Sequence, residues 1–321
     1  MITGMITLEK LRNKPEKCHA FTGLTPAEFD TVLAAVEPLY RSVQAERRDP
    51  SSRRRAIGAG HPFTLSVSDR LLMTLIYWRV YLTQGLLGFL FDLDDSNVSR
   101  EIRRMRQVLL QVLPVPSRDT NLIPSPIANT SRRSSTLQEL LEQHPEWEEL
   151  LIDATEHPVF RPKNRLARRQ RYSGKRKRHT IKTQVVATPN VIVHLVGEIP
   201  GCVHDNLLLL GSGVIPRIPS DRRIRLDLGY EGIEDYYPNH KIEKGIRGQR
   251  GHKITILGKL YNRMLSRLRI PVEHIIGRLK QFNVLASLYR GRWTNHEDTV
   301  TVIAGLVNFI ALGRLIWTAP S

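Results

Sequence analysis

Apolar residues recur every three or four positions through residues 65–113, which is the spacing of amphipathic helices. The pattern predicts a helix at 69–82, a short helix at 84–91 and a third helix that begins near Asp95. This third helix carries four apolar residues on one side: Val98, Ile102, Met105 and Leu109. A short helix, a tight connection and an arginine-rich helix together predict a helix-turn-helix.

The pattern changes near residue 148, where short apolar runs bounded by turn residues replace the helical spacing. Four strands are predicted, at 150–152, 180–187, 191–196 and 224–226. The first ends at Asp153, and the last ends just before Asp227. The order of strand, hairpin, helix, strand and helices fits an α/β fold: a mixed sheet flanked by helices, as in ribonuclease H-like folds, preceded by an all-α region.

Helical spacing returns at residues 271–280, where Pro271 suits a first helical turn because its missing N–H has no partner there in any case. The apolar side of this helix is formed by Val272, Ile275, Ile276 and Leu279. Glu273 and Lys280 lie on another face. The helix therefore presents a carboxylate and an amine away from its apolar stripe.

These changes divide the chain into four parts. They are an N-terminal helical region with a basic loop at 47–55 (1–60), a helix-turn-helix domain (61–113), a linker rich in Pro, Ser and Thr (114–147) and a ribonuclease H-like domain (148–321). The last apolar stretch, 299–317, is nearly long enough to cross a membrane, but polar and charged residues interrupt it. We expect a buried helix there and no membrane partner.

Charge narrows the class of protein. The 321 residues include 48 Lys and Arg against 31 Asp and Glu, a formal net charge of +17. Clustered positive charge of this size indicates nucleic acid first and an anionic membrane second. Two cysteines, Cys18 and Cys202, exclude a disulfide framework and a cysteine-rich zinc finger, and no apolar signal segment is recognised at 1–14. We expect a cytoplasmic protein.

The start of the third helix is a candidate DNA-reading surface. In a helix-turn-helix the second helix enters the major groove and its first residues contact base edges. The residues placed there are Asn97, Ser99, Arg100, Arg103 and Arg104. The alternative is a plain helical bundle whose basic face meets only water.

Three carboxylates are candidate metal ligands. Asp153 and Asp227 each follow a short apolar strand, so neighbouring strands would bring them together, and Glu273 would come from a helix beside them. Carboxylate oxygens in this number suit Mg²⁺, with Mn²⁺ as an alternative ion. Two such ions can activate an attacking oxygen and stabilise a leaving oxygen at a phosphodiester. Taken singly, each residue could instead be a turn, capping or solvated carboxylate.

Asp205 is a rival for the second carboxylate. It follows the predicted hairpin and lies where the next helix would begin, so it could also cap that helix. We rank it below Asp227, because Asp227 directly follows a strand. His204 is a candidate to orient a neighbouring ligand, or it simply bonds to nearby backbone.

Basic residues surround the candidate centre. Residues 161–182 hold eleven Lys and Arg, and Lys175, Arg176, Lys177 and Arg178 are consecutive. Such a segment would form a positive rim for a phosphate backbone, or a solvated loop. Lys280, two helical turns beyond Glu273, could contact a phosphate near the metals, or it is simply an exposed helix lysine.

Several segments resemble one known family. They are 153–158, 172–180, 200–205 and 272–280, with 96–100 in the helix-turn-helix. In order and content they resemble the DDE transposases of bacterial insertion sequence family five, relatives of the PIF/Harbinger enzymes. The resemblance spans about residues 65–314.

The resemblance implies roles for individual residues. The family's two aspartates fall on Asp153 and Asp227 and its glutamate on Glu273. Arg269, Glu273 and Lys280 match a signature of related transposases, which implies that Arg269 and Lys280 bind DNA. Ser266 stands where that signature has tyrosine.

The implied activity is cleavage at terminal inverted repeats with two divalent metal ions, followed by transfer of the 3′-hydroxyl ends into target DNA. The implied partners are double-stranded DNA, as transposon ends and as target, and further copies of the chain when ends are bound. The implied setting is the bacterial nucleoid. The alternatives are a non-catalytic DNA-binding regulator derived from such an enzyme and a stand-alone metal-dependent nuclease.

Overall fold

The computed structural model describes residues 6–46, 65–119, 136–248 and 254–315. The basic loop expected at 47–55 therefore lies outside the described residues. Two compact units are present. The first holds residues up to Pro114 together with Gln281–Val284, and the second holds Val115–Lys280 and Leu285–Leu312.

The first unit is all helical. Its helices are α1 (Leu8–Arg12), α2 (Pro15–Thr22), α3 (Pro26–Glu46), α4 (Val67–Val80), α5 (Gln84–Phe91) and α6 (Asp95–Val112). α5 and α6 form the expected helix-turn-helix pair. Their connection is tight, because Leu93 N donates to Gly88 O at 2.9 Å and a Cβ on Gly88 would lie 2.3 Å from Leu93 O. Only glycine at position 88 allows this approach.

A buried charge cluster ties three helices of this unit together. Glu101 of α6 pairs with Arg70 of α4 at 2.7 Å and also with Arg104, and Tyr40 of α3 donates to it. Burial alone would raise the pKa of Glu101, but hydrogen bonds from Tyr40 and Arg70 and the charge of Arg104 outweigh it and lower that pKa. The carboxylate is therefore ionised and fully engaged inside the unit.

The second unit is built on a seven-stranded mixed sheet. Along the sheet the order is β1-β5-β4-β2-β6-β7, with β3 paired to β4. The strands are β1 (Ser117–Asp119), β2 (Glu149–Pro158), β3 (Tyr172–Ser173), β4 (Arg178–Ala187), β5 (Ile192–Pro200), β6 (Arg223–Arg225) and β7 (Lys241–Glu243). β2, β4 and β5 are antiparallel neighbours, whereas β6 runs parallel to β2 and β7 parallel to β6. The predicted mixed α/β sheet is confirmed.

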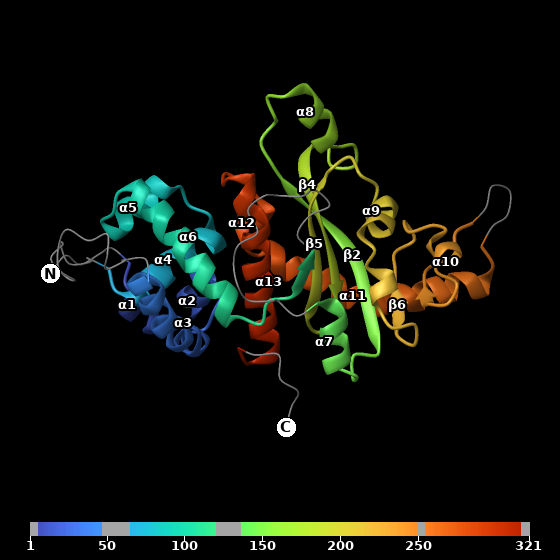
Figure 1. Ribbon diagram of the computed structural model, residues 1–321, viewed down its shortest axis with the longest axis horizontal. Helices are drawn as coiled ribbons and strands as arrows, with labels where there is room; N and C mark the ends of the chain where they lie inside the picture. Colours follow the sequence, from blue (N-terminus) through green and yellow to red (C-terminus); the bar gives the residue numbers. More distant parts are fainter. Residues whose placement is uncertain (1–5, 47–64, 120–135, 249–253, 316–321) are drawn as a thin grey trace. The chain divides into compact units, whose positions relative to one another are not determined.

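Helices cover both faces of the sheet. The helices that follow β1 along the chain are α7 (Leu137–Gln143), α8 (Arg165–Arg171), α9 (Asp205–Ser212), α10 (Ile233–Tyr236), α11 (Ile256–Lys280), α12 (Asn283–Ala286) and α13 (His296–Leu312), with short 3-10 turns at Ile215–Arg217 and Trp293–Asn295. α7 and α9 pack on one face, while α11 lies against β2 and α13 against β5. Figure 1 shows β2, β4 and β5 side by side, with α8 projecting beyond one end of these strands.

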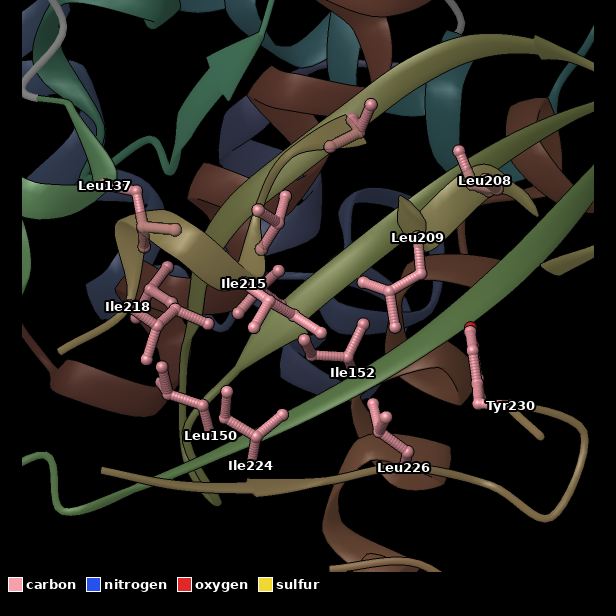
Figure 2. Close-up of a cluster of buried hydrophobic side chains, with 14 of the residues drawn as sticks. Leu137, Leu150, Ile152, Leu208, Leu209, Ile215, Ile218, Ile224, Leu226 and Tyr230 are labelled. Atoms are coloured by element: carbon pink, nitrogen blue, oxygen red, sulfur yellow. The ribbon is translucent and has the colours of Figure 1, made fainter. Parts of the chain in front are cut away.

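The core between the sheet and α9 is aliphatic. Figure 2 shows Ile152 of β2 next to Leu209 of α9 and Leu150 next to Ile224 of β6, with Tyr230 at one edge of the cluster. All five side chains are buried. Burial of a large apolar side chain contributes about 1.5–3 kcal/mol, so this cluster holds α9 on the sheet.

Three local predictions differ from the structure. β2 continues through Asp153 to Pro158, because Asp153 and the residues after it pair with β4 in an unbroken ladder. Pro271 lies inside the 25-residue helix α11 and not in its first turn. Within the segment 114–147 that is predicted to be a linker, β1 joins the sheet.

The apolar C-terminal stretch forms a buried helix, as expected, over the part that is described. α13 is almost wholly buried, and Asn308 bonds to both the N–H and the C=O of Ile192 at 2.8 Å. Within the described part of the chain, no helix is long and apolar enough to cross a membrane.

The charge cluster of the first unit gives a stability prediction. Glu101→Leu leaves Arg70 and Arg104 without their shared carboxylate, and breaking a buried ion pair on one side costs about 3–5 kcal/mol. Urea unfolding of the full chain, followed by circular dichroism, should show that loss. Glu37→Leu is the matched control, because the Arg41–Glu37 pair is exposed and worth less than about 1 kcal/mol. Equal effects of the two substitutions would contradict the assignment.

Candidate active site

Asp153 lies in the middle of β2, between β4 and β6. Its side chain is one quarter exposed, and one carboxylate oxygen accepts the N–H of Ala154 at 2.8 Å. The pKa of Asp153 is raised, first by burial and then by the charges of Asp227 and Asp205, although Arg269 opposes this. A nearby cation would stabilise the ionised form of the Asp153 carboxylate.

Asp227 follows β6 and lies level with Asp153. β2 and β6 pair in parallel with Glu149 opposite Arg223 and Leu151 opposite Arg225, and the same register continued by two residues places Asp227 opposite Asp153. A turn closes directly afterwards, where Tyr230 N donates to Asp227 O at 3.0 Å. The half-exposed Asp227 carboxylate is therefore held at the sheet edge beside Asp153.

β6 is held in place by a buried arginine. Arg225 pairs with Glu243 of β7 at 2.9 Å and with Glu149 of β2. These contacts bridge the three strands, and the Arg225 side chain is only 4% exposed. The register that brings Asp227 to Asp153 is thus fixed by an ion pair on each side of β6.

Arg269 of α11 joins the two aspartates. Its guanidinium lies 2.7 Å from Asp227 Oδ1 and 3.9 Å from Asp153 Oδ2. The side chain is 11% exposed, and its Nε has no hydrogen-bond partner among the described residues. One cation from a single helix therefore serves both carboxylates.

Glu273 lies one turn beyond Arg269 on α11 and is exposed. At 100° per residue, Arg269, Glu273 and Lys280 fall within about 40° of one another around the helix. Within the described ranges, no group of three or more His, Cys, Asp or Glu side chains is arranged to hold a metal ion. The structure thus joins Asp153 with Asp227 and puts Glu273 on the same helix face as Arg269, but it does not close the three carboxylates into a cage.

Lys280 interacts electrostatically with Asp153. Burial lowers its pKa, Arg176 and Lys175 lower it further, and the carboxylates of Glu156 and Asp153 oppose them. Lys280 therefore shares the electrostatic environment of Asp153 with the basic segment at 175–178.

Asp205 takes part in a different contact from the expected helix cap. α9 begins at Asp205, but the Asp205 carboxylate accepts a hydrogen bond from Lys182 Nζ at 2.7 Å. Lys182 also lies 4.0 Å from Glu156, which accepts a bond from Thr180. His204 occupies the cap position without a side-chain cap bond and is exposed. Asp205 still influences the centre, because its charge acts on Asp153.

Tyr230 is a site residue that the sequence reasoning did not single out. Its side chain is 1% exposed, and its hydroxyl has no partner among the described residues. Burial raises its pKa well above the usual value, and Asp153, Asp205 and Asp227 raise it further. The sequence feature that could have identified Tyr230 is its position three residues after Asp227, in the segment Asp227–Tyr230. Figure 2 shows its hydroxyl at the end of a side chain that rises along the edge of the apolar cluster.

His157 is a second residue that was missed. Its Nδ1 lies 3.0 Å from Leu285 O, and its ring packs edge-on against His296 of α13 with ring centres 5.2 Å apart. Burial lowers the pKa of His157 to about 4 and lowers that of His296 well below its usual value. Two neutral histidines thus connect the strand of Asp153 to the segment that follows α11.

The predicted DNA-reading residues occupy different environments within the first unit. Arg100 and Arg103 are exposed on α6. Arg100 donates to Asn97 Oδ1 at 2.8 Å and to the backbone oxygen of Ser96 at 3.0 Å. Ser99 is partly exposed, whereas Arg104 is engaged by Glu101 and Tyr40 and is 18% exposed. Four of the five predicted residues therefore remain accessible.

Lys175, Arg176, Lys177 and Arg178 are all exposed. Lys175, Arg176 and Lys177 lie in the turn between β3 and β4, and Arg178 begins β4. Lys177 adopts a left-handed conformation with φ of 55°, and Arg176 N donates to Ser173 Oγ at 3.1 Å. A tight turn thus concentrates four positive charges. α8 precedes it and adds further exposed arginines.

Comparison with known proteins defines the class. The model of a DDE superfamily endonuclease matches residues 152–308, and that of the helix-turn-helix of DDE superfamily endonucleases matches residues 63–114. Together with the relatives described next, these matches show that the chain belongs to the DDE superfamily endonucleases. Membership implies the use of a divalent metal ion.

Two relatives are named as transposases of insertion sequences. The one for element IS702 of Microchaete diplosiphon is 33% identical over 251 residues, which cover 76% of this chain and 81% of the relative. The one for element IS112 of Streptomyces albus G is 25% identical over 287 residues, or 88% and 90% of the two chains. The finer placement in insertion sequence family five stays a prediction.

Solved structures give weaker similarities. A piggyBac transposase synaptic complex with hairpin DNA aligns over 93% of this chain and 74% of that chain, at 11% identity and a TM-score of 0.35. A Mos1 transposase paired-end complex aligns over 95% and 96%, at 11% identity and a TM-score of 0.21.

The buried histidines predict a pH dependence of stability. An unfolded histidine takes up a proton below about pH 6.5, whereas folded His157 resists protonation to about pH 4, so the free energy of unfolding should fall as pH drops through this window. The slope is about 1.4 kcal/mol per pH unit for each such histidine. Urea unfolding at several pH values should show a smaller slope for His157→Gln. Above pH 7 the two proteins should have the same slope, and identical slopes below pH 6 would contradict the prediction.

Proposed function

We propose that this chain is a DNA transposase that binds the terminal inverted repeats of an insertion sequence, cleaves phosphodiester bonds there and transfers the freed 3′-hydroxyl ends into target DNA. One observation carries the proposal. Asp153 in a central strand and Asp227 beyond the neighbouring parallel strand share one guanidinium from α11, the helix that also carries Glu273.

The donor chemistry fits Mg²⁺ or Mn²⁺. Asp153 and Asp227 already gather around positive charge, and hard divalent cations prefer carboxylate oxygens. Asp153, Asp227 and Glu273 are the residues that would hold two such ions. When bound, the ions supply Lewis acidity and lower the pKa of an attacking water or 3′-hydroxyl.

The chain's own residues do the positioning. The rigid register of β2 and β6 holds Asp153 and Asp227 side by side. Lys280, on the same face of α11 as Glu273, is placed to contact a phosphate next to the scissile bond. Asp205, held by Lys182, adds negative charge near Asp153 without needing to bind an ion itself.

DNA is bound in both units under this proposal. Asn97, Ser99, Arg100 and Arg103 at the start of α6 read the end sequence, because this part of a recognition helix meets base edges. The β3–β4 turn, Lys175–Arg178, holds the phosphate backbone near the carboxylates, as its coupling to Lys280 supports. Joining two transposon ends requires more than one bound chain, so we propose that it acts as an oligomer on DNA.

Loss of any one carboxylate tests the proposed chemistry. Asp153→Ala, Asp227→Ala and Glu273→Ala should each lower Mg²⁺-dependent cleavage of end DNA by more than about 1,000-fold, because metal binding supplies several kcal/mol to the transition state. End binding, measured by gel shift, should remain. Glu231→Ala is the matched control, since this exposed carboxylate pairs only with exposed Arg247 in the described part of the chain.

The products decide between the proposal and its alternatives. Joined end–target products in the wild-type reaction support a transposase, whereas cleavage without joining indicates a nuclease. Binding without either product indicates a regulator. Full activity of Asp227→Ala with loss in Asp205→Ala would move the second ligand to Asp205.

The basic turn gives a separate prediction. Replacing Lys175, Arg176, Lys177 and Arg178 with alanine should weaken binding to any duplex alike and reduce the salt slope of log K by about 3 to 4, roughly 0.9 for each lost phosphate contact. Fluorescence anisotropy at several salt concentrations measures this. Arg103→Ala in α6 should instead lower the preference for end DNA over a scrambled duplex. An unchanged salt slope in the turn variant would show that the turn does not contact DNA.

A further inference from the structure

We propose that Arg269 is the resident counter-ion of the Asp153–Asp227 pair, and that it competes with divalent metal for these carboxylates until a DNA phosphate draws it away. The inference rests on the proposed function and adds regulation of the same site. It makes metal loading depend on DNA. Arg269 thereby becomes a positioning residue for the carboxylates as well as a contact to DNA.

The position of the guanidinium is the first argument. Its nitrogens lie 2.7 Å from Asp227 Oδ1 and 3.9 Å from Asp153 Oδ2, so the cation contacts the first carboxylate directly and lies within ion-pair range of the second. A metal ion held by both would need the same oxygens, because carboxylate–metal distances are about 2.0–2.6 Å. Arg269 and the ion cannot both bind Asp227 Oδ1 at full strength.

Electrostatics gives the second argument. Asp153 feels the negative charges of Asp227 and Asp205 and the positive charge of Arg269. Without Arg269 the half-exposed Asp227 and the more buried Asp153 would repel one another with no cation between them. Arg269 therefore stabilises the metal-free protein and, for the same reason, weakens its affinity for a metal ion.

Arg269 also has hydrogen-bond donors that the aspartates do not use. A guanidinium has five N–H donors, and Nη1 donates to Asp227 Oδ1 at 2.7 Å, whereas Nη2 lies 3.9 Å from Asp153 Oδ2, beyond hydrogen-bond distance, and the buried Nε has no hydrogen-bond partner among the described residues. Arginine also matches phosphate in a two-point contact. A DNA phosphate near α11 can thus engage the guanidinium and release Asp227 to the metal.

Reciprocity follows from thermodynamics. If DNA raises the metal affinity of the site by some factor, metal raises DNA affinity by the same factor. The carboxylates would then bind metal more tightly when DNA is present than when it is absent.

The test compares Mn²⁺ binding by Arg269→Met, Arg269→Lys and wild type. Electron paramagnetic resonance of free Mn²⁺ reports binding without any turnover. In the absence of DNA, Arg269→Met should bind Mn²⁺ about 5- to 150-fold more tightly than wild type, the usual range of coupling between sites. Arg269→Lys keeps the charge and should bind nearly as weakly as wild type. Arg267→Met removes the same charge from an exposed position of α11 and is the matched control, expected to leave Mn²⁺ affinity nearly unchanged.

Two further readouts separate competition from a structural effect. In EDTA, Arg269→Met should melt at a lower temperature than wild type and recover more of that loss when Mn²⁺ is added. A mixed-sequence DNA duplex should raise the Mn²⁺ affinity of wild type and leave that of Arg269→Met unchanged. The Asp227→Asn protein with the same duplex corrects for Mn²⁺ held by DNA itself.

Each outcome bears on a different claim. Wild-type Mn²⁺ affinity in Arg269→Met, or an equal effect of DNA on both proteins, overturns the role of Arg269 while leaving the proposed function intact. Mn²⁺ binding that is insensitive to both Asp153→Asn and Asp227→Asn overturns the proposed metal site instead. If Arg269→Met does not fold, tighter binding of Mn²⁺ by Arg269→Lys on addition of DNA still supports the exchange, and no response to DNA overturns it.

Discussion

Two aspartates that lie close together in a partly buried site repel one another unless a cation lies near both. In this protein Arg269 meets that requirement, at 2.7 Å from Asp227 and 3.9 Å from Asp153. The long helix α11 is therefore tied to the sheet edge by charge as well as by apolar contact. The same helix carries Glu273 and Lys280, so the position of Arg269 sets where these side chains can act.

The register of the sheet brings the two aspartates close enough to share Arg269. Parallel pairing of β6 with β2 places residues 74 positions apart opposite one another, as Glu149 with Arg223 and Leu151 with Arg225, and Asp153 and Asp227 have this same separation. Arg225 holds the register through Glu149 and Glu243. A shift of one residue would move Asp227 away from Asp153, so the structural ion pairs of β6 serve the site indirectly.

Buried charge also organises the helical unit, with a different consequence. Glu101 gathers Arg70, Arg104 and Tyr40 from three helices, which fixes α6 but removes Arg104 from the surface. Arg100 and Arg103 remain exposed on the same helix. A helix rich in arginine thus divides its residues between holding the fold and meeting a partner, and only tertiary contacts reveal which is which.

The sequence by itself determined the helix-turn-helix, the mixed sheet and the four carboxylates worth considering, because helical and strand periodicity and turn residues act over a few neighbouring positions. It did not determine that β2 runs on through Asp153, that Pro271 lies inside α11, or that β1 and β7 join the sheet, since these depend on partners far along the chain. The tertiary structure decided that Arg269 contacts Asp227, that Asp205 pairs with Lys182, that Tyr230 is buried within reach of the aspartates' charges, and that His157 is buried against His296. Such contacts follow from the register of paired strands and the rotation of a packed helix, which no local pattern encodes.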